Sequence, residues 1–266
     1  MKAIVCVKQV PDTSGKVAVN ADGTLDRASM QTIINPDDMN AMEAALALKD
    51  ETGCKVVVVT MGPPPAEGML RELIAMGADE AVLVSAREFG GSDTFATSQI
   101  VAAAIKKIGL EDEDVVFCGR QAIDGDTAQV GPQLAEKLGI PQISYVAGIE
   151  KNGNTVTCKR MLEDGYMMIQ TKTPCLLTCV KELNQPRYMS IPGIVGCYEK
   201  PLSVYNYETL KDDPLIELDT IGLKGSPTNI FKSFTPPQKG VGMMLEGADK
   251  ATCEKLAGLL AAKHII

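Results

Sequence analysis

The chain has 266 residues, of which 45% are apolar and 23% are charged, and its 34 acidic and 26 basic side chains give a formal net charge of -8. This length and composition are typical of a soluble globular protein with a sizeable core. The acidic balance disfavours nucleic acid and anionic membranes as partners, because both attract basic surfaces. No stretch approaches the roughly 20 apolar residues of a membrane helix, and the N-terminus lacks a secretory signal. We therefore expect a cytoplasmic protein without membrane insertion.

The cysteines and the single histidine limit the possible chemistry. The only histidine is His264, near the C-terminus, which disfavours catalysis by a histidine base and histidine-rich metal sites. The eight cysteines contain no C-x-x-C pair, so neither a disulfide framework nor a metal site is indicated. They are Cys6, Cys54, Cys118, Cys158, Cys175, Cys179, Cys197 and Cys253. We predict no catalytic residue and no metal ligand.

Short apolar runs alternate with helical periods over the first 140 residues, which is typical of parallel strands joined by helical crossovers. The runs are nearly continuous and β-branched, as expected for strands buried on both faces. They predict strands at Ala3–Val7, Lys55–Thr60, Ala81–Val84 and Val115–Cys118. The sequence therefore predicts an α/β fold with an open, doubly wound, mostly parallel sheet.

Four helices are expected between and after these strands. Asn35 is a candidate N-cap with Pro36 at the first helical position. A second helix contains Met69 and stops at Gly77, and glycines also end the third and fourth helices. The third begins near Asp93 or Thr94 and ends at Gly109, and the fourth runs from about Thr127 to Leu138, before Gly139.

The pattern changes after the fourth helix. Asn152-Gly153-Asn154 predicts a hairpin between strands at residues 147–151 and 155–160. A further strand pair is expected at 166–171 and 175–180, so that antiparallel strands extend one edge of the sheet. Frequent prolines then break up residues 182–238, which favours an arm wrapped around a partner chain, and Lys250–Ala262 is an amphipathic helix. We divide the chain into an α/β domain over 1–180 and an extended arm with a terminal helix over 181–266.

Ligands of doubly wound sheets bind beyond the carboxyl ends of the strands. The loops there begin at Val7, at Met61, at Gly90 and at Gly119, and the third of them is the Gly90–Thr94 turn. The most specific is the loop from Gly119 to Val130, in which a glycine permits close backbone approach and a helix start offers N–H groups to an anion. It matches neither a Walker A nor a G-x-G-x-x-G motif, and an ordinary N-capped βα turn remains the alternative. Lys8 could neutralise a phosphate or be merely solvated.

Eight segments together resemble the electron transfer flavoprotein β-subunit family over essentially the whole chain. In order, they are V-C-V-K from Val5, I-N-P-D from Ile34, V-T-M-G-P from Val59, A-M-G-A-D from Ala75, G-R-Q-A-I-D-G-D from Gly119, C-K-R-M-L-E-D-G-Y from Cys158, P-C-L-L-T from Pro174 and L-N-Q-P-R-Y-M-S-I-P from Leu183. The resemblance implies an adenine-nucleotide-binding, HUP-like α/β domain. It also implies pairing with a larger α subunit that carries FAD.

The resemblance further implies that this chain binds an adenine nucleotide, either AMP or a second FAD. Carried over by position, the cofactor-binding residues are Cys6, Val7, Lys8, Asn35, Pro36, Asp37, Asp38, Thr60, Met61, Gly62, Pro63, Gly119, Arg120, Gln121, Ala122, Ile123, Asp124, Gly125, Asp126, Thr127, Ala128, Gln129 and Val130. Leu183 matches the leucine by which family members dock an acyl-CoA dehydrogenase, although burial against the α subunit would explain it equally.

The small residues of Met61–Pro65, the loop after Gly119 and the tail segment Gly240–Gly247 resemble the electron-bifurcating members of the family. For those members the resemblance implies NADH as donor, ferredoxin or flavodoxin as one acceptor, and an acyl-CoA dehydrogenase reached through the α-subunit FAD as the other. The alternatives are a non-bifurcating carrier with structural AMP, a stand-alone nucleotide sensor and an ATP-splitting ligase. The chain is expected to act as an electron carrier, and an enzymatic activity of its own stays open.

Overall fold

The structure is a computed structural model that describes residues 1–12, 31–228, 240 and 242–266. The chain divides into two compact units, Met1–Phe231 and Lys232–Ile266. The first unit contains a nine-stranded sheet with the order β11-β5-β4-β1-β6-β10-β7-β8-β9. A separate two-stranded antiparallel sheet joins β2 (Gln9–Pro11) to β3 (Thr32–Ile34). Among the described residues, no helix is both long and apolar enough to cross a membrane.

The predicted parallel strands form the centre of the large sheet. They are β1 (Lys2–Cys6), β4 (Lys55–Met61), β5 (Glu80–Val84) and β6 (Val115–Gly119). β1 pairs in parallel with β4 on one side and with β6 on the other, so the strand order reverses at β1. In such sheets the reversal leaves a crevice at the carboxyl ends, where ligands bind.

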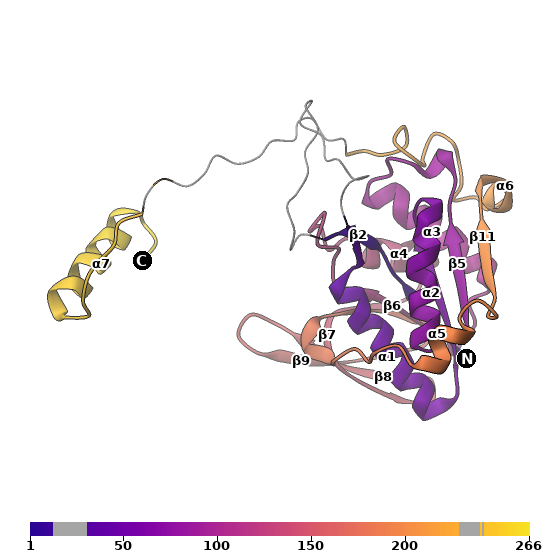
Figure 1. Cartoon of the computed structure of the whole chain (residues 1–266), viewed down its shortest axis with the longest axis horizontal. Helices are drawn as coiled ribbons and strands as arrows, with labels where there is room; N and C mark the ends of the chain where they lie inside the picture. Colours follow the sequence, from indigo (N-terminus) through magenta and orange to yellow (C-terminus); the bar gives the residue numbers. More distant parts are fainter. Residues whose placement is uncertain (13–30, 229–239, 241) are drawn as a thin grey trace. The chain divides into compact units, whose positions relative to one another are not determined.

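Helices cover both faces of the sheet, which confirms the doubly wound α/β prediction (Figure 1). α1 (Pro36–Thr52) and α2 (Glu67–Met76) pack on one face, where Phe117 and Leu70 belong to a buried cluster. α3 (Thr94–Ile108) and α4 (Val130–Leu138) pack on the other, with Ile100 and Leu134 in a second cluster. Short 3-10 turns, η1 (Pro64–Ala66) and η2 (Arg87–Phe89), precede α2 and α3.

The antiparallel edge consists of β7 (Gln142–Asn152), β8 (Thr155–Met161) and β9 (Tyr166–Lys172), which confirms the predicted hairpin. The expected pairing of the next strand was wrong. β10 (Cys175–Cys179) does not pair with β9 but lies between β6 and β7, parallel to both. All five of its residues are buried, whereas β9 is largely exposed. A strand that is almost continuously apolar gains most from a position covered on both faces.

The predicted start of the fourth helix was also wrong. α4 begins at Val130, not near Thr127. Pro132 explains the difference, because proline lacks an N–H and fits only the first turn of a helix. If the helix began at Thr127, the ring of Pro132 would clash with the Ala128 carbonyl. Asp126 and Ala128 instead have φ values of 50° and 52°, outside the helical region.

The chain beyond residue 180 adds elements that the sequence did not predict. They are η3 (Lys181–Leu183), α5 (Ile191–Gly196), β11 (Leu202–Tyr205) and α6 (Tyr207–Leu210). β11 pairs in parallel with β5 and extends the sheet. Arg187 forms ion pairs of 2.8 Å with Glu43 and with Asp50 of α1. The terminal helix α7 (Lys250–Ala262) is confirmed with the predicted bounds. A partner-wrapping role of residues 181–266 stays a prediction.

Candidate functional site

The carboxyl ends of β1 and β6 meet the start of α1 at the point where the strand order reverses. The Asn35 N–H donates to the Lys8 carbonyl at 2.9 Å, which fixes the start of α1 beside the end of β1. Asp38, one turn into α1, is buried and accepts hydrogen bonds from the N–H of Lys8 at 2.8 Å and of Gly119 at 2.9 Å. A single carboxylate therefore joins the first residues of two candidate loops.

Gly119 is required by this close approach. An added Cβ would overlap Asp38 Oδ1 and would lie only 2.7 Å from the carbonyl carbon of Asp37 and from the Asp38 nitrogen. The group that approaches this glycine closely is the start of α1, and a close approach by a ligand stays a prediction.

Asn35 holds the loop that follows Gly119. Its side chain is fully buried; Nδ2 donates to the Gln121 carbonyl at 2.8 Å, and Oδ1 accepts from the Ile123 N–H at 3.1 Å. Asn35 occupies the predicted N-cap position of α1 but makes no side-chain cap hydrogen bond. The asparagine therefore stabilises a loop more than 80 residues away in sequence instead of its own helix.

The charged side chains of the site are arranged in pairs. Lys8 Nζ lies 2.8 Å from Asp124, and Arg120 Nε lies 3.3 Å from Asp37 Oδ2, at ion-pair distance. Gln121 Nε2 donates to Asp126 Oδ1 at 2.7 Å. The acidic residues that the sequence places beside a predicted anion site are thus held by neighbouring donors. A bound phosphate would compete with Asp124 and Asp37 for the two basic groups.

The second half of the loop has a backbone suited to binding an anion. The N–H groups of Gly125 and Asp126 both turn back to the Ala122 carbonyl, at 3.3 and 2.9 Å. Left-handed residues within a turn create a concave run of N–H groups that can hold an anion. Asp126 and Ala128 have left-handed backbone conformations. In residues other than glycine, such conformations cost about 1–3 kcal/mol each and concentrate at ligand sites. The N–H groups of Val130 and Gly131 lie in the first turn of α4. The positive end of the helix dipole therefore faces the loop.

The end of β4 contributes differently from the loops around Asp38. Thr60 is buried and its Oγ1 has no hydrogen-bond partner among the described residues, while Met61 and Gly62 are half-buried. The Gly62 N–H donates to the Val84 carbonyl at 3.1 Å, and Pro63 leads into η1. Over the described chain, no hydrogen bond joins this segment to the loop after β6. Thr60–Pro63 therefore lies at the same sheet edge without belonging to the Asp38 network.

The position of β10 adds a contact that sequence reasoning missed. The Arg120 N–H donates to the Cys179 carbonyl at 2.8 Å, so the end of β10 supports the start of the loop. Cys6 and Cys118 are register neighbours on β1 and β6, and all eight cysteines are free thiols. The almost continuous apolar run at 175–179 was the sequence signal that could have placed this strand centrally. Within the described ranges, no group of three or more His, Cys, Asp or Glu side chains could hold a metal ion.

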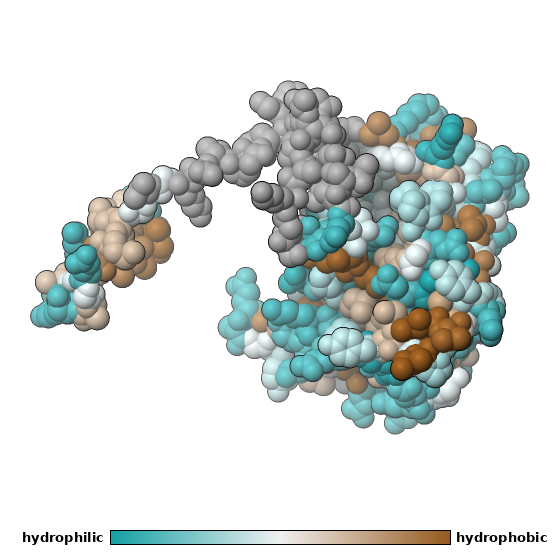
Figure 2. Space-filling model, in the orientation of Figure 1, coloured by the Kyte–Doolittle hydropathy of each residue, from teal (hydrophilic) through white to brown (hydrophobic). Residues whose placement is uncertain are grey.

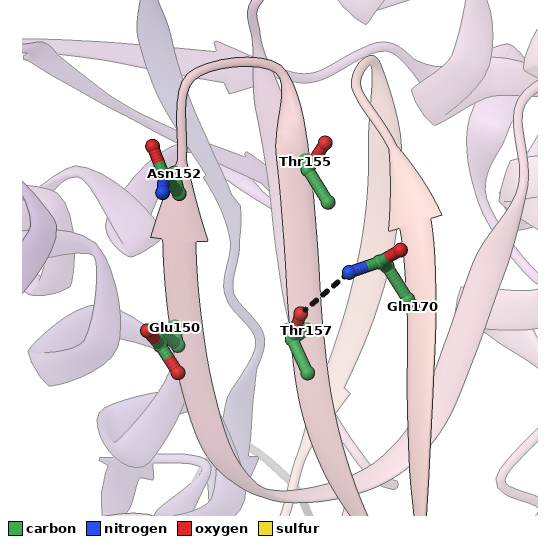
Figure 3. A pocket seen from close by; sticks show the side chains of 5 residues that line it. All are labelled: Glu150, Asn152, Thr155, Thr157 and Gln170. Carbon is green, nitrogen blue, oxygen red and sulfur yellow. Dashed lines mark hydrogen bonds between the residues drawn. The ribbon is translucent and has the colours of Figure 1, made fainter.

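A polar depression of about 440 Å³ lies elsewhere, on the antiparallel edge of the sheet (Figure 3). Side chains from β7, β8 and β9 line it, and Gln170 Nε2 donates to Thr157 Oγ1 across two strands at 3.3 Å. The lining residues are Glu150, Asn152, Thr155, Thr157 and Gln170. None of them was a predicted site residue.

Asp38 links the site to pH. Burial raises the pKa of its carboxyl from the ordinary value of 3.8 to about 7, and surrounding hydrogen-bond donors offset part of this effect. Between these two values the folded state binds more protons than the unfolded chain, so its stability decreases as pH rises and then levels off above about 7.

We expect Asp38→Asn to remove this pH dependence. The variant should lose more free energy of unfolding, relative to the wild type, at about pH 5 than at about pH 8, because only the wild type gains from protonation. Urea unfolding at both pH values measures the difference. Asp112→Asn, at an exposed position before β6, is the matched control. Parallel pH curves for wild type and Asp38→Asn would contradict the burial argument.

A second prediction concerns Gly119. Gly119→Ala should lower the free energy of unfolding by about 1–3 kcal/mol, the usual cost of overpacking a filled site. Gly125→Ala is the control in the same loop, because an added Cβ there has nothing within 4 Å. Denaturant unfolding of both variants tests the contact, and equal stability would show that the loop relaxes away from Asp38.

Comparisons with known proteins agree with this architecture. A family model described as "Electron transfer flavoprotein domain" matches residues 22–207. Aligned over 100% of both chains are the "Acryloyl-CoA reductase electron transfer subunit gamma" of Anaerotignum propionicum, 73% identical, and the "Caffeyl-CoA reductase-Etf complex subunit CarD" of Acetobacterium woodii, 51% identical. The "Electron transfer flavoprotein subunit beta" of Clostridium acetobutylicum is 49% identical over the same full lengths. The chain therefore belongs to the electron transfer flavoprotein family, as a β-type subunit.

Proposed function

We propose that this chain binds FAD at the carboxyl ends of β1 and β6, as the β subunit of a heterodimer whose larger α subunit carries another FAD. The observation that carries the proposal is the network of Asn35 and Asp38, which holds Lys8 and the loop after Gly119 in one place. A buried network of this kind pre-organises backbone groups for a ligand, which lowers the entropy cost of binding.

The residues present fit an adenine nucleotide. The left-handed residue Ala128 and the start of α4 at Val130 offer N–H groups to phosphates. Lys8 and Arg120 supply positive charge once a phosphate displaces their carboxylate partners. A bound flavin would supply reversible one- and two-electron chemistry, and the chain would bind it, orient it and exclude water.

In this proposal the complex carries out flavin-based electron bifurcation. NADH is the electron donor, ferredoxin or flavodoxin is one acceptor, and an acyl-CoA dehydrogenase, reached through the α-subunit FAD, is the other. The relatives whose names place them in acryloyl-CoA and caffeyl-CoA reductase complexes support this choice of terminal partner. AMP in the same loop, in a non-bifurcating carrier, is the second candidate, because the described phosphate-binding groups suit both nucleotides.

The nucleotide content of the purified αβ complex, measured by acid extraction and chromatography, tests the proposal. We expect about two FAD per heterodimer and no AMP, the stoichiometry of one adenine nucleotide for each nucleotide-binding domain. Lys8→Gln should lower the occupancy of the β site and leave the α-subunit FAD in place, whereas Lys255→Gln on α7 should change neither. One FAD and one AMP would favour the non-bifurcating carrier. A folded complex without either nucleotide in β would contradict the site.

We also propose that the dehydrogenase docks around Leu183. Leu183 is itself half-buried and packs against the core, but an apolar surface follows it on and around α5 (Figure 2). Ile191, Val195 and Tyr198 are 79%, 75% and 75% exposed. Exposed apolar patches of this kind mark interaction sites on otherwise polar surfaces. The ion pairs of Arg187 with α1 fix the chain at the edge of this surface.

Ile191→Ser should weaken electron transfer to an acyl-CoA dehydrogenase by roughly tenfold or more, the effect of removing a central apolar contact. Its melting temperature should stay unchanged, because the side chain is exposed, whereas Leu183→Ser should lower both. Val204→Ser, at an exposed apolar position on β11, is the control. Unchanged steady-state rates with Ile191→Ser would place the docking surface elsewhere.

A further inference from the structure

A segment late in the chain lies over the turn that leads into α3. We define this segment, Thr220–Thr228, as the strap. The Leu223 N–H donates to the Gly90 carbonyl at 2.9 Å, and the Gly222 N–H donates to Ser92 Oγ at 3.1 Å. The strap is thus hydrogen-bonded to a turn about 130 residues earlier in the chain.

The contact between strap and turn is closely packed. Gly91 and Gly222 have φ values of 74° and 64°, and an added Cβ on Gly91 would lie 2.9 Å from Leu223 Cβ. An added Cβ on Gly222 would overlap the Glu88 carbonyl oxygen. Ile221 is buried in the cluster beneath α3. Glycines on both sides therefore allow the two backbones to approach, and the strap is a fixed part of the first unit.

Asp93 connects the strap to the loop after β6. Its N–H donates to Ser226 Oγ at 2.8 Å, and its Oδ2 accepts from the Thr228 N–H at 3.0 Å. Its Oδ1 caps α3 by accepting from the Ala96 N–H at 3.1 Å. The next residue, Thr94, donates from Oγ1 to Gln129 Oε1 at 3.2 Å, immediately before α4 begins.

Gln99 makes a second connection. It is 5% exposed, and its Nε2 donates to the Thr220 carbonyl at 2.9 Å. Its Oε1 accepts from Lys137 Nζ of α4 at 3.0 Å, and that ammonium group lies 4.4 Å from the centre of the Phe95 ring. One buried amide on α3 therefore joins the strap to the far end of α4.

We propose that the strap sets the position of α4 and of the loop that precedes it, so that Asp93 and Gln99 are positioning residues for nucleotide binding. The functional part of this inference rests on the nucleotide site proposed above. The physical reason is that α3 holds both ends of α4. Gln99 bonds both the strap and Lys137 of α4, and Thr94, which bonds Gln129, directly follows Asp93, which bonds the strap. When a buried hydrogen-bonding group loses its partner, it favours a shifted arrangement, and the helix it holds shifts with it.

Two substitutions separate the strap contact from the other contact of each residue. Asp93→Asn keeps an oxygen to cap α3, since asparagine caps helices as well as aspartate does, but leaves an amide group facing the Thr228 N–H. Gln99→Glu keeps the acceptor for Lys137 and places a carboxylate oxygen against the Thr220 carbonyl. Lys224→Ala is the control, because Lys224 lies in the strap and its exposed side chain pairs with Asp219.

Hydrogen–deuterium exchange of the αβ complex and titration of nucleotide-depleted complex with FAD and with AMP test the inference. Each positioning variant should exchange faster in the strap and in the first turn of α4, and should bind nucleotide about five- to tenfold more weakly, as expected for one net hydrogen bond. Faster exchange in the strap alone, with unchanged affinity, would overturn the inference. Faster exchange in α4 in a complex whose wild type binds neither nucleotide would support the positioning of α4 and refute the nucleotide site itself.

Discussion

The carboxylate of Asp38 is the constraint on which the site depends. It lies in the first turns of α1 and accepts the N–H groups that follow β1 and end β6. The strand order reverses at β1, which leaves a crevice between the loop after β1 and the loop after β6. The Asp38 carboxylate links these two loops across it. The same approach excludes any side chain at Gly119. Helix, strand and loop thus meet at one buried ionisable group, whose burial raises its pKa to about 7.

The charges around this point are balanced inside the protein. Lys8 pairs with Asp124, Arg120 lies beside Asp37, and Gln121 donates to Asp126. These pairs would allow an acidic loop to serve as the proposed anion site, because each carboxylate has a protein partner. An incoming phosphate would exchange partners instead of meeting unpaired acids. The remaining donors are backbone N–H groups, which carry no competing charge.

Other parts of the fold fix this site from outside. β10 supports the loop through the Cys179 carbonyl, and the strap reaches α4 through Asp93 and Gln99 of the α3 region. The apolar surface on α5 lies on a different part of the unit, where α5 packs against α2. Nucleotide binding and partner docking would therefore use separate surfaces of one rigid sheet.

The sequence alone determined the fold class, the central strands, the hairpin and the terminal helix α7, because hydrophobic period and turn residues act within a few positions of one another. It also placed Asn35 and Asp38 at the start of a helix and Gly119 at the end of a strand. Only the tertiary structure decided that β10 lies inside the sheet, that the Asn35 side chain holds a loop instead of a helix, and that Asp38 joins two strands. These outcomes depend on contacts between residues far apart in the chain, for which local pattern carries no signal. The start of α4 is an intermediate case. Pro132 indicates a start no earlier than about Val130, but Gly125 and the aspartates before the helix suggested an earlier N-terminus.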